Sequence, residues 1–275
     1  MKQSITFECE VITPMFLAGA DGITPELRPP SIKGALRFWW RALNGHLPLE
    51  ELKKMEGEIF GSTEKQSKFK MSFIKKDFLI TTEKPLPHKE RSFTKEAIRT
   101  KEVFQLTFRC QNEAIATIIK NLFPLCCVLG GFGGRARRGF GSVKITKPSD
   151  YPNSLEKIYI LLNNLVPSRF ILIDDKIIYK QTQKQDYPYI EEIEIGRANA
   201  NLLRTIGQAT HDINKKNGYD YGEAVGSANP RFSSPVYISA LESNKGLQSV
   251  ITTLHHPKIK KAYYDIQKEL KKEIL

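Results

Sequence analysis

The feature that most constrains the fold is a change of hydrophobic period along residues 1–150. Residues 3–13, 69–73 and 101–110 place apolar side chains at every second position, which predicts half-buried strands. Residues 29–45 and 112–131 repeat apolar residues at helical spacing, and residues 141–146 predict a short closing strand. The predicted order is strand, helix, strand, strand, helix, strand, which is the order of a ferredoxin-like (split βαβ) unit.

The pattern of residues 151–275 is less regular. Residues 168–180 and 233–241 predict strands, residues 195–216 predict a helix, and a last helix is predicted to start at Pro257. Since no strand follows that helix here, we expect any second ferredoxin-like unit to be incomplete or rearranged. Pro, Ser, Asp and Asn cluster over residues 148–154, so we predict one domain over residues 1–150 and a second over residues 151–275.

The charge of the chain favours a polyanionic partner. The formal net charge is +12 and the isoelectric point is near 9.4, with most of the excess in residues 1–150. The competing interpretation is a lysine-rich surface that faces only water. We favour the polyanion because the arginines gather in one helix and one loop.

The helix carries the first group of cations. Residues 31–43, SIKGALRFWWRAL, predict a helix capped by Ser31, with Trp39 and Trp40 on the buried stripe and therefore not available to stack on bases. The opposite face carries Lys33, Arg37 and Arg41. No carboxylate in the segment offsets their repulsion, so we expect a negative partner outside it, and the helix start would suit a phosphate.

A glycine-rich stretch, GGFGGRARRGFG at residues 130–141, carries the second group. It is not a dinucleotide fingerprint, which must follow a strand and open a helix, and it lacks the Gly-Lys-Ser/Thr of a Walker A loop. We interpret it as a crossing where missing Cβ atoms let a nucleic-acid backbone approach while arginines meet phosphates or base edges. The alternative is a helix C-cap followed by a flexible loop whose arginines face water.

Several stretches resemble one family. Residues 16–43, residues 58–63 (EIFGST), residues 130–143 and NPRFSSP at residues 229–235 are similar to the RAMP (repeat-associated) superfamily of CRISPR systems, in particular to the first subunits of type III-B (Cmr) effector complexes. The resemblance implies an α+β fold of tandem ferredoxin-like (RRM-like) modules. It also implies a non-catalytic subunit that contacts crRNA, target single-stranded RNA and other Cmr subunits in antiviral defence.

The charge pattern and the resemblance together define the candidate RNA-binding residues. They are Lys33, Arg37, Arg41, Phe132, Arg135, Arg137, Arg138 and Arg231. Guide and target choose each other by base pairing, so we expect the protein to read backbone shape and charge.

Three other functions stay open. Backbone subunits of such complexes use an aspartate in the loop after the first strand for metal-dependent cleavage of RNA, and the comparable loop here, AGADGITPE, contains Asp21 with Glu26 as its only near acidic partner. A metal-independent ribonuclease that uses a histidine, such as His46 near the basic helix, is a further alternative. The chain could also be a purely structural subunit that binds protein neighbours.

Cysteine usage and hydropathy set the remaining expectations. Cys9, Cys110, Cys126 and Cys127 form no CxxC motif, so we expect reduced core thiols and neither a zinc site nor disulfides. The apolar runs are far shorter than the roughly 18 residues of a membrane span. The first residues lack the pattern of a secretion signal. We therefore expect a cytoplasmic protein with no cofactor, no resident metal and no membrane partner.

Overall fold

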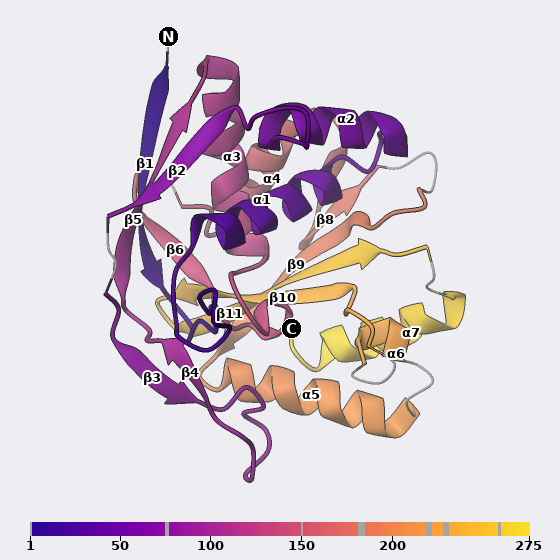
Figure 1. The fold of residues 1–275 in the computed structure, drawn as a ribbon. Coiled ribbons are helices and arrows are strands. Elements are labelled where there is room, and N and C mark those ends of the chain that lie inside the picture. Colours follow the sequence, from indigo (N-terminus) through magenta and orange to yellow (C-terminus); the bar gives the residue numbers. More distant parts are fainter. Residues whose placement is uncertain are drawn as a thin grey trace.

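A computed structural model describes residues 2–74, 77–149, 151–180, 185–217, 222–227, 231–257 and 260–275. Within these ranges the chain forms a four-stranded sheet, a five-stranded sheet and a separate two-stranded hairpin, all antiparallel, joined by helices (Figure 1). The fold class is therefore α+β with antiparallel sheets, as predicted.

The first sheet has the strand order β2-β5-β1-β6. Its strands and helices are β1 (Gln3–Val11), α1 (Pro29–Leu43), α2 (Leu49–Phe60), β2 (Phe69–Phe73), β5 (Val103–Cys110), α3 (Glu113–Leu129) and β6 (Val143–Lys147). A hairpin of β3 (Ile80–Glu83) and β4 (Lys95–Ile98) is inserted between β2 and β5. The predicted strand and helix order of residues 1–150 is found, and α2 and the hairpin are additions to it.

The period of two in the strands decides which face of this sheet is buried. In β1, Phe7, Cys9 and Val11 face the helices and are at most 2% exposed. Thr6 lies on the opposite face, where its hydroxyl is 2.9 Å from that of Thr107 on β5. The outer face is therefore polar, and α1 and α3 pack on the inner face.

Helix α1 begins earlier than predicted. Its first residue is Pro29 and its N-cap is Arg28, so Ser31 lies inside the first turn instead of capping it. The fixed φ of proline suits the first turn of a helix, which explains the earlier start. Trp39 and Trp40 are 1% and 5% exposed, which confirms that they belong to the core.

The second sheet has the order β10-β11-β9-β8-β7. The elements of this half are α4 (Leu155–Leu165), β7 (Phe170–Ile173), β8 (Lys176–Tyr179), β9 (Tyr189–Asn199), α5 (Leu202–Asn217), α6 (Gly222–Val225), β10 (Val236–Ser243), β11 (Gly246–His255) and α7 (Lys261–Lys272). The helix predicted over residues 195–216 starts only at Leu202, because Ile195, Ala198 and Asn199 pair with β11 and extend β9.

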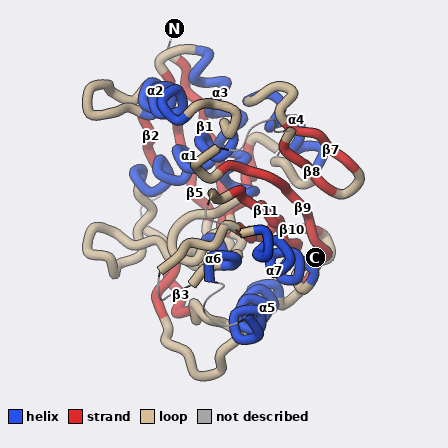
Figure 2. Tube along the Cα trace, turned by 90° about the vertical axis from the view of Figure 1, so that its right-hand side faces the viewer, coloured by secondary structure: helices blue, strands red, loops and turns tan. Residues whose placement is uncertain are grey.

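The two sheets and their helices form four layers. α1 and α3 lie between the sheets, and α5, α6 and α7 cover the far face of the second sheet (Figures 1 and 2). The largest hydrophobic cluster contains residues of both predicted domains, since it includes Phe7 of β1, Leu162 of α4 and Ile193 of β9. The two predicted domains thus share a core, and the boundary near residue 150 stays a prediction.

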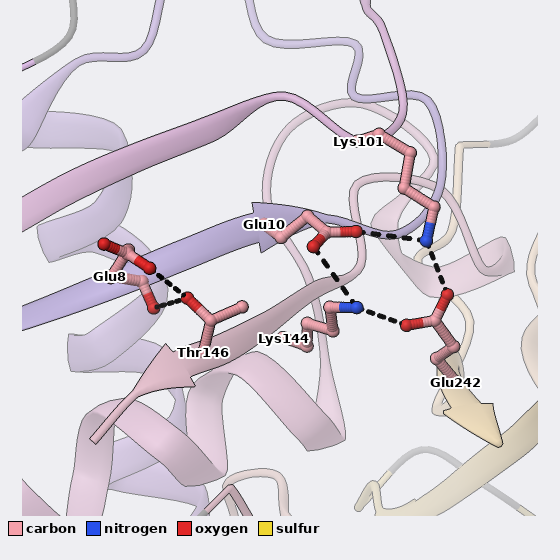
Figure 3. A network of polar contacts seen from close by, with 6 residues as sticks. All are labelled: Glu8, Glu10, Lys101, Lys144, Thr146 and Glu242. Carbon is pink, nitrogen blue, oxygen red and sulfur yellow. Dashed lines mark hydrogen bonds and ion pairs between the residues drawn. The ribbon is translucent and has the colours of Figure 1, made fainter. Parts of the chain in front are cut away.

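Ion pairs also connect the two sheets. Lys101 and Lys144 each contact both Glu10 of β1 and Glu242 of β10 (Figure 3). The distances from Nζ of Lys101 to the two carboxylates are 3.1 Å and 2.6 Å. This network holds the end of β10 against the edge of the first sheet.

The four cysteines are free thiols inside the core, as predicted: Cys9, Cys110, Cys126 and Cys127. Burial raises the pKa of each thiol above its usual range. They act as small hydrophobic residues.

Candidate nucleic-acid interface

A groove of about 1200 Å³ opens where the two halves of the chain meet. Its walls come from α1, the loop after β3, the glycine-rich loop, α5 and the segment that leads into β10. The β3–β4 hairpin and α5 lie at the same end of the molecule (Figures 1 and 2). His88 of the loop after β3 contacts His211 of α5: their imidazole rings are stacked with centroids 5.3 Å apart.

The groove is strongly basic. The cations that line it are Lys89, Arg135, Arg137, Arg138, Lys215 and Arg231. No Asp or Glu is found among its lining residues in the described part of the chain. Lys89, Arg135, Lys215 and Arg231 are exposed, and none forms an ion pair with a carboxylate that the structure describes. The groove therefore carries uncompensated positive charge that an anionic ligand can neutralise.

The glycine-rich loop is held by hydrogen bonds to the chain's own backbone, unlike the flexible loop of the alternative interpretation. Gly134 N–H donates to Phe16 C=O at 2.7 Å, and Gly139 N–H donates to Ile238 C=O of β10 at 2.6 Å. A Cβ at Gly141, whose φ is +67°, would stand 2.0 Å from Phe132 O. The glycines thus serve positive φ and close approach to the chain's own backbone, which corrects the expectation that they make room for a nucleic-acid backbone.

The three arginines of the loop differ in environment. Arg135 is exposed, whereas Arg138 is 8% exposed and donates to the carbonyls of Arg137, Val236 and Val225. Burial, and then Arg135 and Arg137, lower the pKa of Arg138 to about 9. Arg138 therefore connects the loop to the second half of the chain. The expectation that the arginines of this loop are available to meet phosphates or base edges is corrected for Arg138.

Arg137 is partly buried and fixed in position. Its guanidinium lies 4.4 Å from the ring centroid of Tyr237 and 5.9 Å from that of Phe38. It also donates to Ser234 C=O at 2.5 Å. Its planar group is thus oriented within the groove before any ligand binds.

The helix cations have a partner inside the protein. Arg37 Nε and Arg41 Nη1 lie 2.6 Å and 2.5 Å from the same oxygen of Glu56, a 7%-exposed residue of α2. Lys33 Nζ lies 5.7 Å from the ring centroid of Phe69, and burial followed by Arg37 lowers its pKa. None of the three cations lines the groove. The negative partner expected outside the helix is Glu56, at least for the two arginines.

Phe132 is buried in the core, whereas Arg231 is exposed. Phe132 is 1% exposed and stacks on Phe123 in the core, so its ring offers no surface to RNA. Arg231 is exposed and lines the groove, whereas residues 229 and 230 of the same motif lie outside the described residues. Of these two candidates, only Arg231 is accessible from the groove.

Several residues that line the groove were not predicted from the sequence as RNA-binding residues. They are Phe38, His88, Lys89, His211, Lys215 and Tyr237. The available signals were Lys89 and Arg91 beside His88, and the lysines that end helix α5. Neither signal indicates that the two segments lie across one groove.

The carboxylate of Asp21 accepts its hydrogen bonds from residues of its own loop. The donors are the Thr24 hydroxyl, at 2.5 Å, and the N–H groups of Ile23 and Thr24. The Thr24 hydroxyl, followed by these N–H groups, lowers the pKa of Asp21. Among the described residues no group of three His, Cys, Asp or Glu side chains could hold a metal ion.

The model of the RAMP superfamily matches residues 8–144. Subunit Cmr1-2 of the CRISPR Cmr system of Pyrococcus furiosus is 30% identical over 174 residues, which cover 50% of this chain and 93% of that protein. Subunit Cmr1-1 of the same organism is 30% identical over 153 residues, 46% of this chain and 42% of that protein. The chain therefore belongs to the RAMP superfamily, and within it to the Cmr1-like subunits of type III-B Cmr complexes.

Solved structures share the fold over nearly the whole chain. The crystal structure of apo Cmr1 from Pyrococcus furiosus matches with a TM-score of 0.64 at 18% identity, covering 97% of this chain and 96% of that one. A chain of the type III-B Cmr-beta complex bound to cognate target RNA matches with a TM-score of 0.61 at 14% identity, covering 98% and 99%. Separately, no helix in the described ranges is long and apolar enough to cross a membrane.

Proposed function

We propose that this chain is a non-catalytic, RNA-binding subunit of a type III-B Cmr effector complex and that it holds single-stranded RNA, crRNA or target, in the basic groove. The observation that carries the proposal is the set of four exposed, unpaired cations in a groove without described carboxylates. Single-stranded RNA suits such a groove because its phosphates are spaced along a flexible backbone. Neighbouring Cmr subunits are the proposed protein partners.

The absence of catalysis is part of the proposal. The carboxylate of Asp21 is satisfied by its own turn, and among the described residues no group of three His, Cys, Asp or Glu side chains is placed to hold a metal ion. Arg135, Arg137 and Arg231 carry guanidinium groups, which bind phosphate well and are poor general bases.

We also infer that the chain is built from two ferredoxin-like modules. The first module runs β1-α1-β2-β5-α3-β6. The second runs β9-α5-β10-β11-α7, and β8 pairs with β9 at the edge where a fourth strand would lie. This arrangement supports the predicted rearranged second module, and residues of both proposed modules line the groove.

The experiment that tests RNA binding is a salt titration. We expect the isolated chain to bind single-stranded RNA with little sequence preference and a log–log salt slope of roughly −2 to −4, from about −0.7 per phosphate neutralised. A variant with alanine at Lys89, Arg135, Lys215 and Arg231 should bring the slope close to zero.

Lys54→Ala and Arg109→Ala are the matched controls, because both side chains are exposed and lie outside the groove. Each should keep the wild-type slope. A slope near zero for the wild type would contradict the proposal and favour a purely structural subunit.

A further inference from the structure

The groove has an aromatic wall as well as cations. Phe38 of α1 and Phe232 are half-buried, and Tyr237 of β10 is 8% exposed; all three line the groove. Phe38 and Tyr237 lie with ring centroids 5.2 Å apart and an interplanar angle of 34°. An exclusively phosphate-binding surface has no need for this apolar wall.

Arg137 extends the aromatic wall into the groove. It lies over the Tyr237 ring at 4.4 Å, contacts Phe38 at 5.9 Å and is anchored on Ser234 C=O. Because these contacts already fix the guanidinium plane, stacking a planar ligand on it costs the protein little further conformational entropy. Guanidinium planes and aromatic rings are the two kinds of surface on which proteins stack unpaired bases.

The charges around this wall select the class of ligand. Arg135 and Lys89 are exposed and unpaired in the same groove, and its described residues include no carboxylate. A ligand that contacts both the aromatic wall and the unpaired cations must carry a flat ring joined to an anionic group. A nucleotide has this chemistry. The groove of about 1200 Å³ exceeds the roughly 300–1,000 Å³ of pockets for single small ligands, so it has room for neighbouring nucleotides.

We propose that Phe38 and Arg137 form a stacking platform for one unpaired nucleobase of the bound RNA, while the flanking phosphates contact Arg135 and Lys89. This inference rests on the proposed RNA binding and adds a base-dependent contribution to it. Stacking accepts any base because every base has a π-face, so the platform is independent of sequence. It holds a nucleotide that is not paired, which distinguishes single-stranded from fully paired RNA.

The test uses two probes on the full chain: a single-stranded RNA and an oligonucleotide of the same length whose ribose-phosphate backbone carries no bases. Both probes carry the same phosphates, so both should show the same salt slope. At a fixed salt concentration the probe without bases should bind about 5- to 140-fold more weakly, the effect of about one stacked base. Equal affinities for the two probes would overturn the platform and leave RNA binding intact, whereas flat salt dependence for both would overturn RNA binding itself.

Variants then assign the site. Phe38→Leu keeps an apolar side chain, and Arg137→Lys keeps the charge; each removes one planar group, and thermal melts establish that each variant is folded. In either variant the preference for the probe with bases should fall at least about threefold, with the salt slope unchanged. Phe93→Leu is the control, because Phe93 is 64% exposed and lies outside the groove. A preference that survives both platform variants, or that disappears in Phe93→Leu, would show that bases bind elsewhere.

Discussion

Replacing Arg138 with alanine should destabilise the fold, whereas replacing Arg135 should not. Arg138 donates to Arg137 C=O at 3.0 Å, to Val236 C=O at 3.3 Å and to Val225 C=O. Val236 C=O keeps a second donor, the hydroxyl of Ser234 at 2.9 Å, so the main loss is at Val225. A hydrogen bond to a charged group contributes about 1.5–3 kcal/mol, and loss of the buried stem adds a cavity.

One effect opposes this loss. The guanidinium is buried near Arg135 and Arg137, which lowers its pKa to about 9, so its removal also relieves a desolvation cost. We expect the hydrogen bonds and the cavity to dominate and the free energy of unfolding to fall by about 2–4 kcal/mol, or about 4–12 °C in melting temperature. Arg135→Ala changes an exposed side chain and should stay within about 0.5 kcal/mol.

Denaturation in urea, followed by tryptophan fluorescence, measures both variants under the same conditions. The Arg135 variant should instead weaken RNA binding and reduce the magnitude of the salt slope by about 0.7. If Arg138→Ala unfolds at the same urea concentration as the wild type, Arg138 does not connect the two halves and the reasoning fails.

Three further predictions concern single residues. Burial, followed by His211, Lys89 and Arg135, lowers the pKa of His88 from its ordinary value near 6.5. As pH falls, the imidazole of the unfolded chain is therefore protonated before that of the folded chain. The stabilisation that is present above the ordinary pKa is then lost as pH falls through the lowered value. His88→Gln should therefore reduce the loss of stability between pH 7.5 and 5 in urea titrations, and an unchanged loss would contradict this. Glu242→Gln breaks the network of Figure 3 and should cost about 1 kcal/mol at low salt and less at 1 M salt; equal costs at both would argue against an electrostatic origin. With Mg²⁺ or Mn²⁺, neither the wild type nor Asp21→Ala should cleave RNA on a denaturing gel, and cleavage that disappears in the variant would restore the metal-dependent alternative.

Elements with a clear local period could be predicted from the sequence. The strands around Phe7 and Phe108, the helix that buries Trp39 and the reduced core cysteines depend on local hydrophobic patterns. Strand β9 was predicted in part as helix, because its last residues, IGRAN, are continued by the pattern of α5 and only pairing with β11 extends the strand.

The site was predictable only in part, since it depends on contacts between distant segments. Lys89 and Lys215 come together across the groove although 126 positions separate them in the chain. The glycine-rich loop was identified correctly as a special segment, but Arg138 and Phe132 point inward because β10 and α3 pack against it. Sequence pattern indicates that a loop is constrained; it does not indicate which of its arginines the rest of the fold uses.

The buried carboxylate of Glu56 has a consequence for how related sequences should differ. Because Arg37 and Arg41 share one of its oxygens, the three positions form a unit in which the loss of the acid leaves two cations next to each other. Among relatives we expect positions 37, 41 and 56 to change together, with a neutral residue at 56 accompanied by the loss of at least one arginine. Position 135, whose arginine forms no ion pair with a carboxylate among the described residues, should vary independently of all three.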